Sequence, residues 1–178
     1  MTRISIYLAL VTGVVFLWAR PLGSAQMSPS QIVERFCEMD AQGMRLTPEG
    51  LREMATSFPG SAGTVPSTKT IVVRDFVVSR PEINGNRGEL YVEYVYLGSI
   101  DVKLGRFSRL PYLKVRSGFD VVRTDGFSDW KISVAPPESH ITVSTAVNYV
   151  KRIHDAATDL STRKNAARAI ANLSRLTR

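Results

Sequence analysis

One stretch of the chain, residues 89–104 (ELYVEYVYLGSIDVKL), is apolar at every second position except at Gly98. A period of two is typical of a β-strand with one buried face. Sixteen residues at about 3.3 Å each would span roughly 53 Å if straight, whereas a domain of this size has a radius of gyration of only about 15 Å. The strand must therefore bend, and Gly98, the gap in the apolar pattern, is the predicted position of the bend.

A second apolar segment, residues 70–80, is predicted to pair with this long strand across a turn at residues 84–85 (Asn-Gly). That turn would place Asp75 opposite Tyr94, on the apolar side of the sheet. A shift of register by one residue would bring Arg74 and Phe76 to that side instead. We favour the first register because it leaves the arginines of the segment on the solvated face.

The next hairpin has the strongest short turn signal in the chain, Asp-Gly at residues 125–126. With that turn, Val121 faces Trp130 and Phe119 faces Ile132. The apolar residues of both strands then fall on one side of the sheet. Two patterns that are independent of each other thus predict the same buried face.

Helices are predicted before and after these strands. Ser-Pro at 28–29 and Thr-Pro at 47–48 each precede apolar residues at helical spacing, as a helix cap followed by a first-turn proline does. A longer apolar stripe begins near Ser144, and a weaker one follows from Ser161. The predicted fold class is α+β, a strongly curved antiparallel sheet of about four strands in a cone-like arrangement packed by amino-terminal helices, with one or more further helices at the carboxyl terminus.

The amino terminus has the layout of a secretory signal peptide. A short basic start precedes an uncharged run at residues 4–18, and Pro21 and a small-residue triplet at 23–25 follow. We expect cleavage after Ala25, which makes the protein exported, either periplasmic or secreted. The alternative is an uncleaved membrane anchor, although the run is shorter than the roughly 20 residues of a spanning helix.

The net charge of +7 is concentrated in the carboxyl-terminal segment. Residues 139–178 hold seven basic and two acidic side chains, whereas residues 26–138 hold fourteen of each. We therefore divide the chain into a signal peptide (1–25), a cone-like α+β domain (26–138) and a basic helical arm (139–178). The neutral sheet domain disfavours nucleic acid as a partner. The arm would pack on the domain, mediate a homodimer, or lie on an anionic membrane surface; the sheet is a second candidate for a homodimer contact.

The order of these elements, ending in the segment WKI at residues 130–132, resembles the nuclear-transport-factor-2-like (SnoaL-like) superfamily over residues 28–134. The resemblance implies a cone whose concave sheet face and helices enclose a pocket. Members of that superfamily include isomerases, dehydratases, epoxide hydrolases and non-catalytic binding or dimerising modules. A third helix that is usual in the family is not evident here, and the carboxyl-terminal helices extend beyond the common cone.

The resemblance also implies which side chains would line the pocket, namely Val73, Val77, Val92, Tyr94, Tyr96, Phe119, Val121, Trp130 and Ile132. Enzymes of the superfamily place an Asp with Tyr, His or Arg partners inside the cone, so Asp75 with Tyr94 is the candidate catalytic pair. The structural alternative is that Asp75 bonds to a backbone group or an arginine at the pocket mouth. His140 and His154 are expected on the surface.

The sequence gives no indication of a reactive cysteine, a metal site or a cofactor site. Cys37 is the single cysteine and falls on an apolar helix face, which predicts a buried structural thiol. No metal-ligand spacing and no phosphate or dinucleotide fingerprint is present, so neither a metal nor a cofactor is expected.

Three functions remain open. The first is an exported module that binds a small apolar ligand or a protein partner without catalysis. The second is a pocket enzyme of the isomerase, dehydratase or hydrolase type that uses Asp75 with Tyr94. The third is an envelope structural protein that assembles through its basic arm.

Overall fold

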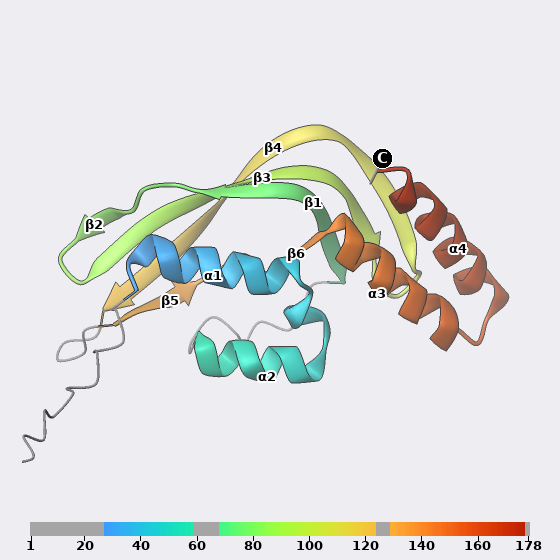
Figure 1. Ribbon diagram of the computed structural model, residues 1–178, viewed down its shortest axis with the longest axis horizontal. Helices are drawn as coiled ribbons and strands as arrows, with labels where there is room; N and C mark the ends of the chain where they lie inside the picture. Colours follow the sequence, from blue (N-terminus) through green and yellow to red (C-terminus); the bar gives the residue numbers. More distant parts are fainter. Residues whose placement is uncertain (1–26, 59–67, 124–128, 177–178) are drawn as a thin grey trace, which may run out of the picture.

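The computed structural model describes residues 27–58, 68–123 and 129–176. The predicted signal peptide and the turn predicted at 125–126 lie outside these residues. Within them the chain forms an arched sheet with helices beneath the arch and at one of its ends (Figure 1). The elements in order are α1 (Pro29–Ala41), the 3-10 helix η1 (Met44–Leu46), α2 (Pro48–Ser57), β1 (Lys69–Val78), β2 (Glu82–Asn84), β3 (Arg87–Asp101), β4 (Arg106–Arg123), β5 (Trp130–Val134), β6 (Ser139–Thr142), α3 (Val143–Ala156) and α4 (Leu160–Ser174).

The predicted fold class is confirmed as α+β, with a strongly curved and mostly antiparallel sheet. The strand order in the described part of the chain is β5-β4-β3-β1-β6, and β2 pairs with β3. About four strands were predicted, and the described residues form six, because the short β2 and β6 were not predicted. β6 pairs in parallel with β1 (Thr70 with Ser139, Val73 with Thr142), so the segment expected as a helical arm begins with a strand of the sheet.

The amino-terminal helices begin where the sequence predicts. Ser28 caps α1, its side chain accepting the N–H of Gln31, while the Gln31 side chain accepts the N–H of Ser28. Thr47 caps α2 in the same way by accepting the N–H of Gly50 at 3.1 Å. None of the helices in the described ranges is long and apolar enough to cross a membrane.

The long strand is interrupted at the predicted position. The β3–β4 pairing is irregular between Tyr96 and Gly98, and the β1–β3 pairing shifts at the same level. A Cβ atom at Gly98 would lie 2.3 Å from Cε2 of Phe107 and 2.7 Å from the carbonyl oxygen of Ser108. Glycine is thus required here because β4 and its Phe107 ring approach the β3 backbone closely.

The favoured register of the first hairpin is wrong. Val73 does pair with Tyr96, but Phe76 rather than Asp75 pairs with Tyr94. The two-residue turn lies one position later than predicted, at residues 85–86, with Gly85 at φ 60°. Two further irregularities in β1 follow, and they leave the side chain of Asp75 exposed. The alternative register is only half right, because Phe76 is inward but Arg74 is exposed.

The second hairpin keeps the predicted face but not the predicted pairs. Val121 pairs with Ile132 instead of Trp130, and Trp130 pairs with Arg123. The register therefore differs by two residues from the expectation. Because side chains alternate with a period of two, a shift of two leaves them on the same face. Phe119, Val121, Trp130 and Ile132 are accordingly all buried.

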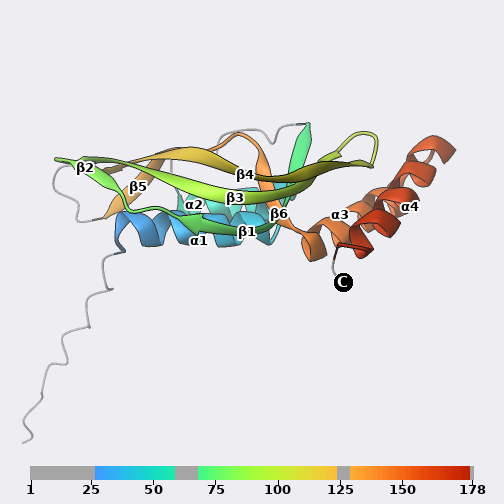
Figure 2. The ribbon, with the colours of Figure 1, turned by 90° about the horizontal axis from the view of Figure 1, so that it is seen from above.

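Two hydrophobic clusters cover successive parts of the sheet. The first lies between α1 and the sheet and includes Phe36, Leu90, Tyr94 and Phe119. The second joins α3 and α4 to the other end of the sheet, and its buried members are Val72, Ile100, Ile141, Ala146, Val150, Ala166, Ala169 and Leu173. Figure 2 shows α3 and α4 at the opposite end of the sheet from β2 and β5. The apolar stripe of the basic arm is thus buried within this chain.

β4 extends far beyond its neighbour β5. It pairs with β3 from Arg106 to Val122, but with β5 only through residues 120–123. Within the described part of the chain, most of one edge of β4 therefore has no strand beside it. Pro111 lies within this edge. The exposed basic side chains along it are Arg106, Arg109, Lys114 and Arg116.

Candidate functional site

The predicted catalytic pair is separated in the structure. Asp75 is exposed in the irregular part of β1, whereas only 1% of Tyr94 is exposed. Phe76 occupies the position opposite Tyr94 that the favoured register gave to Asp75. The Asp75 carboxylate is therefore not in the interior and cannot serve Tyr94 as a general base.

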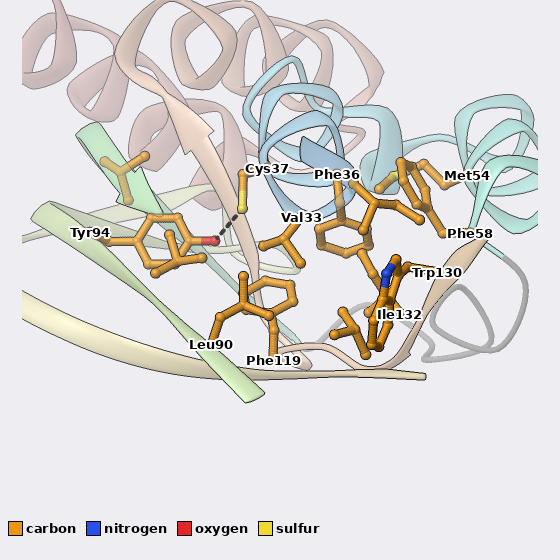
Figure 3. Close-up of a cluster of buried hydrophobic side chains, with 14 residues drawn as sticks. Val33, Phe36, Cys37, Met54, Phe58, Leu90, Tyr94, Phe119, Trp130 and Ile132 are labelled. Atoms are coloured by element: carbon orange, nitrogen blue, oxygen red, sulfur yellow. Dashed lines mark hydrogen bonds between the residues drawn. The ribbon is translucent and has the colours of Figure 1, made fainter. Parts of the chain in front are cut away.

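The residues predicted to line a concave pocket instead form a filled core (Figure 3). Phe36 of α1 contacts Phe58 edge to face at 5.3 Å between ring centroids, and Phe119 of β4 at 5.6 Å. These rings occupy the space between α1 and the sheet. The buried members of the predicted set are Val73, Val92, Tyr94, Phe119, Val121, Trp130 and Ile132. Two members differ, because Tyr96 is half-buried and Val77, 66% exposed, lies outside the core.

A buried polar cluster, which sequence reasoning missed, lies where α1 ends beside β6. Its charged side chains are Asp40 at the end of α1 and Arg45 in η1, with 1% and 3% exposure. Arg45 Nη1 donates to the carbonyl oxygens of Pro136 and Glu138, and its Nη2 donates to that of Pro137. The guanidinium also lies 3.6 Å from Asp40 Oδ2. Arg45 thus holds the segment between β5 and β6 against η1.

His140 of β6 completes this cluster, and its predicted surface position is wrong. Its backbone N–H donates to Asp40 Oδ2 at 2.8 Å, and its ring stacks on Tyr94 with centroids 4.0 Å apart. Nε2 lies 2.9 Å from the hydroxyl oxygen of Tyr96. His154, by contrast, lies on the surface as predicted, beside Asp155.

Cys37 is buried, as predicted, and its Sγ lies 3.2 Å from the hydroxyl oxygen of Tyr94 (Figure 3). Burial raises the pKa of the Cys37 thiol to about 12. Burial likewise raises the pKa of Tyr94 well above its ordinary value. Because the thiolate is the reactive form of cysteine, this thiol is a structural group.

The polar cluster is not arranged for proton transfer. The ring Nδ1 of His140 lies 3.8 Å from Asp40 Oδ2, which is beyond hydrogen-bond distance. Nδ1 and Asp40 Oδ1 have no hydrogen-bond partner among the residues that the structure describes. The imidazole is therefore fixed by stacking and by Tyr96 rather than by an acid, and the cluster serves to join α1, η1 and β6.

An open pocket of about 340 Å³ adjoins the cluster and shares Arg45 with it. We call it the η1–α3 pocket. Its lining residues are Arg45, Leu46, Thr47, Pro48, Leu51, Thr68, Val102, Lys103 and Tyr149. Pockets of roughly 300–1,000 Å³ with mainly apolar walls and a few polar groups are typical of small-molecule sites.

The wall formed by the β3–β4 loop is held at several points. The N–H of Val102 donates to the carbonyl oxygen of Thr68 at 3.0 Å. Asp101 Oδ1 accepts the N–H groups of Lys103 and Leu104, each at 3.0 Å. Gly105, at φ 60°, packs so closely on α3 and α4 that a Cβ atom there would lie 3.1 Å from Ile153. This wall of the pocket is thus held in place by contacts within the chain.

A larger hollow of about 440 Å³ lies at the start of α3, between Arg74, Tyr112 and Leu176. Arg74 is the only charged side chain in its lining, and it already donates a hydrogen bond to the Tyr112 hydroxyl at 3.2 Å. In the described ranges no group of three or more His, Cys, Asp or Glu side chains is placed to hold a metal ion. The η1–α3 pocket is therefore the candidate functional site.

Only one feature of the sequence indicates this site. Arg45 lies between Met44 and Leu46, an arginine flanked by apolar residues next to a helix start. The carbonyl oxygens that it binds are more than ninety residues away in the chain, and the other walls come from the β3–β4 loop and α3. The site is thus assembled by tertiary structure.

The fold and this pocket define a small α+β protein with a curved sheet and a mainly apolar pocket among the described residues. No protein-family model, no curated protein and no solved structure matches the chain.

Proposed function

We propose that the protein is a non-catalytic binding module that takes a small, largely apolar ligand in the η1–α3 pocket. The observation that carries this proposal is the pocket itself, with walls of Leu46, Pro48, Leu51 and Val102. Apolar surface of this kind gains free energy when a ligand removes it from water.

The chemistry of the lining supports binding rather than catalysis. Its nine residues include no carboxylate, imidazole or thiol. Asp40 and His140, which lie beside Arg45 or its partners, are closed off in the core, and the carboxylate of Asp101 is engaged by the backbone N–H groups of Lys103 and Leu104. An enzyme that used Asp75 with Tyr94 has no support in the geometry, because the two side chains lie in different environments.

Two wider assignments belong to the same proposal. Export would follow from the leader expected at residues 1–25. Membership of the nuclear-transport-factor-2-like superfamily would follow from the shared arrangement of a curved sheet covered by helices, which supports that family without giving a ligand.

The proposal is tested by filling the pocket. Leu51→Trp places an indole where the ligand would lie, and Leu160→Trp is the matched control because Leu160 is 67% exposed at the start of α4. We expect the neutral dye Nile red to bind the wild-type chain and the control with equal affinity, with displacement by 1-decanol. Leu51→Trp should weaken binding at least tenfold.

Equal binding by Leu51→Trp and the wild-type chain would overturn the proposal. Val102→Phe, in the β3–β4 part of the lining, repeats the test with a smaller change, and circular dichroism of each variant reports whether the fold is retained. Nile red that is not displaced by 1-decanol would place the dye elsewhere and would also count against the pocket.

A further inference from the structure

We infer that the ligand of the η1–α3 pocket is an amphiphilic monocarboxylate, whose head group pairs with Lys103 while its apolar chain lies against the walls. This inference rests on the proposed function and adds the chemical class of the ligand. It is carried by the charges of the lining, the fixed turn that bears Lys103 and the size of the pocket.

The lining carries two positive charges, Arg45 and Lys103, and no negative charge. The charge of Arg45 is already compensated, because its guanidinium donates to three carbonyl oxygens and lies beside Asp40. The ammonium group of Lys103 has no such partner among the described residues. Lys103 is therefore the cation that the pocket offers to a ligand. The net positive charge, which remains without the two arginines of the expected leader, favours the approach of anions from solution.

The backbone that bears this cation is fixed by the fold, while the Lys103 side chain itself is exposed. The two N–H groups accepted by Asp101 Oδ1 fix the turn at Lys103, and the contact of Val102 with Thr68 fixes the turn to β1. The same turn thus presents an apolar wall and a positive charge to one hollow. A ligand that satisfies both must be apolar along its length and negative at one end.

Tyr149 of α3 adds a hydroxyl group to the same lining. Burial raises the pKa of Tyr149, so that its hydroxyl stays protonated and remains a hydrogen-bond donor at neutral pH. Arg152 lies over its ring at 5.7 Å and adds positive charge on that side. A carboxylate, with two acceptor oxygens, can use both the ammonium and the hydroxyl donor.

Size and head-group chemistry restrict the class further. A volume of about 340 Å³ holds roughly eleven groups of the size of a water molecule, at about 30 Å³ each. That is the size of a carboxylic acid with a medium-length chain. Phosphate sites usually combine arginine forks or several backbone N–H groups, whereas this lining offers a single uncompensated ammonium.

The experiment compares ligands that differ only in the head group, by calorimetry on the full chain below the concentrations at which they form micelles. The ligands are decanoate, 1-decanol and monodecyl phosphate. Lys103→Met removes the charge but keeps an apolar stem, and Lys151→Met, on the exposed side of α3, is the control. We expect decanoate to bind about three to ten times more tightly than 1-decanol, the range of a partly exposed charged hydrogen bond. Lys103→Met should abolish this difference, and Lys151→Met should preserve it.

The outcomes separate this inference from the proposed function. Equal binding of decanoate and 1-decanol, unchanged by Lys103→Met, would overturn the inference and leave the proposed function standing. Tighter binding of monodecyl phosphate than of decanoate would overturn the assignment to carboxylates. Binding of neither decanoate nor 1-decanol to the wild-type chain would overturn both proposals.

Discussion

At the scale of single residues, the interior depends on one arginine and one histidine that come from distant parts of the chain. Arg45 binds three successive carbonyl oxygens, and His140 is held by Asp40 through its backbone and by Tyr94 through its ring. Buried polar groups cost free energy unless they are hydrogen-bonded, so each contact matters to the stability of the junction. The same junction keeps Cys37 and Tyr94 away from water.

This burial makes the protein less stable in alkali. Well below pH 9 the Cys37 thiol is protonated in both the folded and the unfolded state. Between its ordinary pKa of 9.0 and the folded value of about 12, only the unfolded chain loses the proton. The free energy of unfolding should therefore fall as pH rises through this window, by at most about 1.4 kcal/mol per pH unit from Cys37. Urea unfolding between pH 7 and pH 11 measures it.

Cys37→Ala isolates the contribution of the thiol. The variant loses packing at every pH, but the fall that begins near pH 9 should be shallower than in the wild-type chain. Above pH 10 both proteins should lose stability, because burial also raises the pKa of Tyr94 from its ordinary value of 10.0. Identical slopes between pH 9 and pH 10 would contradict the assignment to Cys37.

At the scale of elements, β3 carries the curvature of the sheet, and Gly98 allows it. In Gly98→Ala the new methyl group would meet the Phe107 ring and the Ser108 carbonyl oxygen at 2.3–2.7 Å. Relief requires movement of the β4 backbone, so we expect a loss of about 1–3 kcal/mol in the free energy of unfolding. Urea unfolding followed by circular dichroism measures this loss.

Gly118→Ala is the control for this substitution. Gly118 is also in a strand, but a Cβ atom there would meet only Tyr91, at an ordinary 3.8 Å. Its effect on stability should be small, or slightly favourable because alanine restricts the unfolded chain. Equal losses in the two variants would show that the close approach at Gly98 does not matter to stability.

Alternation along the strands predicted the faces of the sheet but not its registers. Leu90, Val92 and Tyr94 are buried as their parity predicts. The pairs were wrong because they depend on turns and irregularities: the first turn lies one residue later, and β1 has extra residues at 74–75. A shift of two in the second hairpin was harmless to the faces, whereas a shift of one moved Asp75 out to solvent.

The candidate site could not be predicted in the same way. A pocket was expected on the concave face, but Phe36, Phe58 and Phe119 fill that space. The size and mutual contacts of these rings, from α1, the end of α2 and β4, decide this, and alternation along the strands does not indicate how much space they fill. The η1–α3 pocket depends on how η1 and α3 are placed in the tertiary structure, and the sequence of neither element indicates which other element it will pack against.

At the scale of the whole molecule, α4 is part of the cover of the sheet. Leu173 is fully buried in the cluster that also holds Val72 and Ile100. Leu173→Ala should therefore lower the free energy of unfolding by about 2–5 kcal/mol, as truncation of a buried leucine does. Leu160→Ala, at an exposed position of the same helix, should change it by no more than about 0.5 kcal/mol.

Thermal and urea unfolding of these two variants distinguish a packed helix from a solvated one. If Leu173→Ala were as stable as Leu160→Ala, α4 would not contribute to the fold. In the structure, α4 packs through its apolar side and leaves the basic side chains Arg163, Lys164 and Arg168 exposed.

The open edge of β4 has a consequence for how copies of the protein behave in a concentrated solution. Unpaired backbone groups along a strand invite a second strand, and this is a common beginning of aggregation. Pro111 offers no N–H to such a strand, and Arg106, Arg109, Lys114 and Arg116 would bring like charges together if two β4 edges met. Within the described residues, Pro111 and these like charges therefore oppose edge-to-edge pairing of two β4 strands, in addition to the contacts that α4 makes with β4.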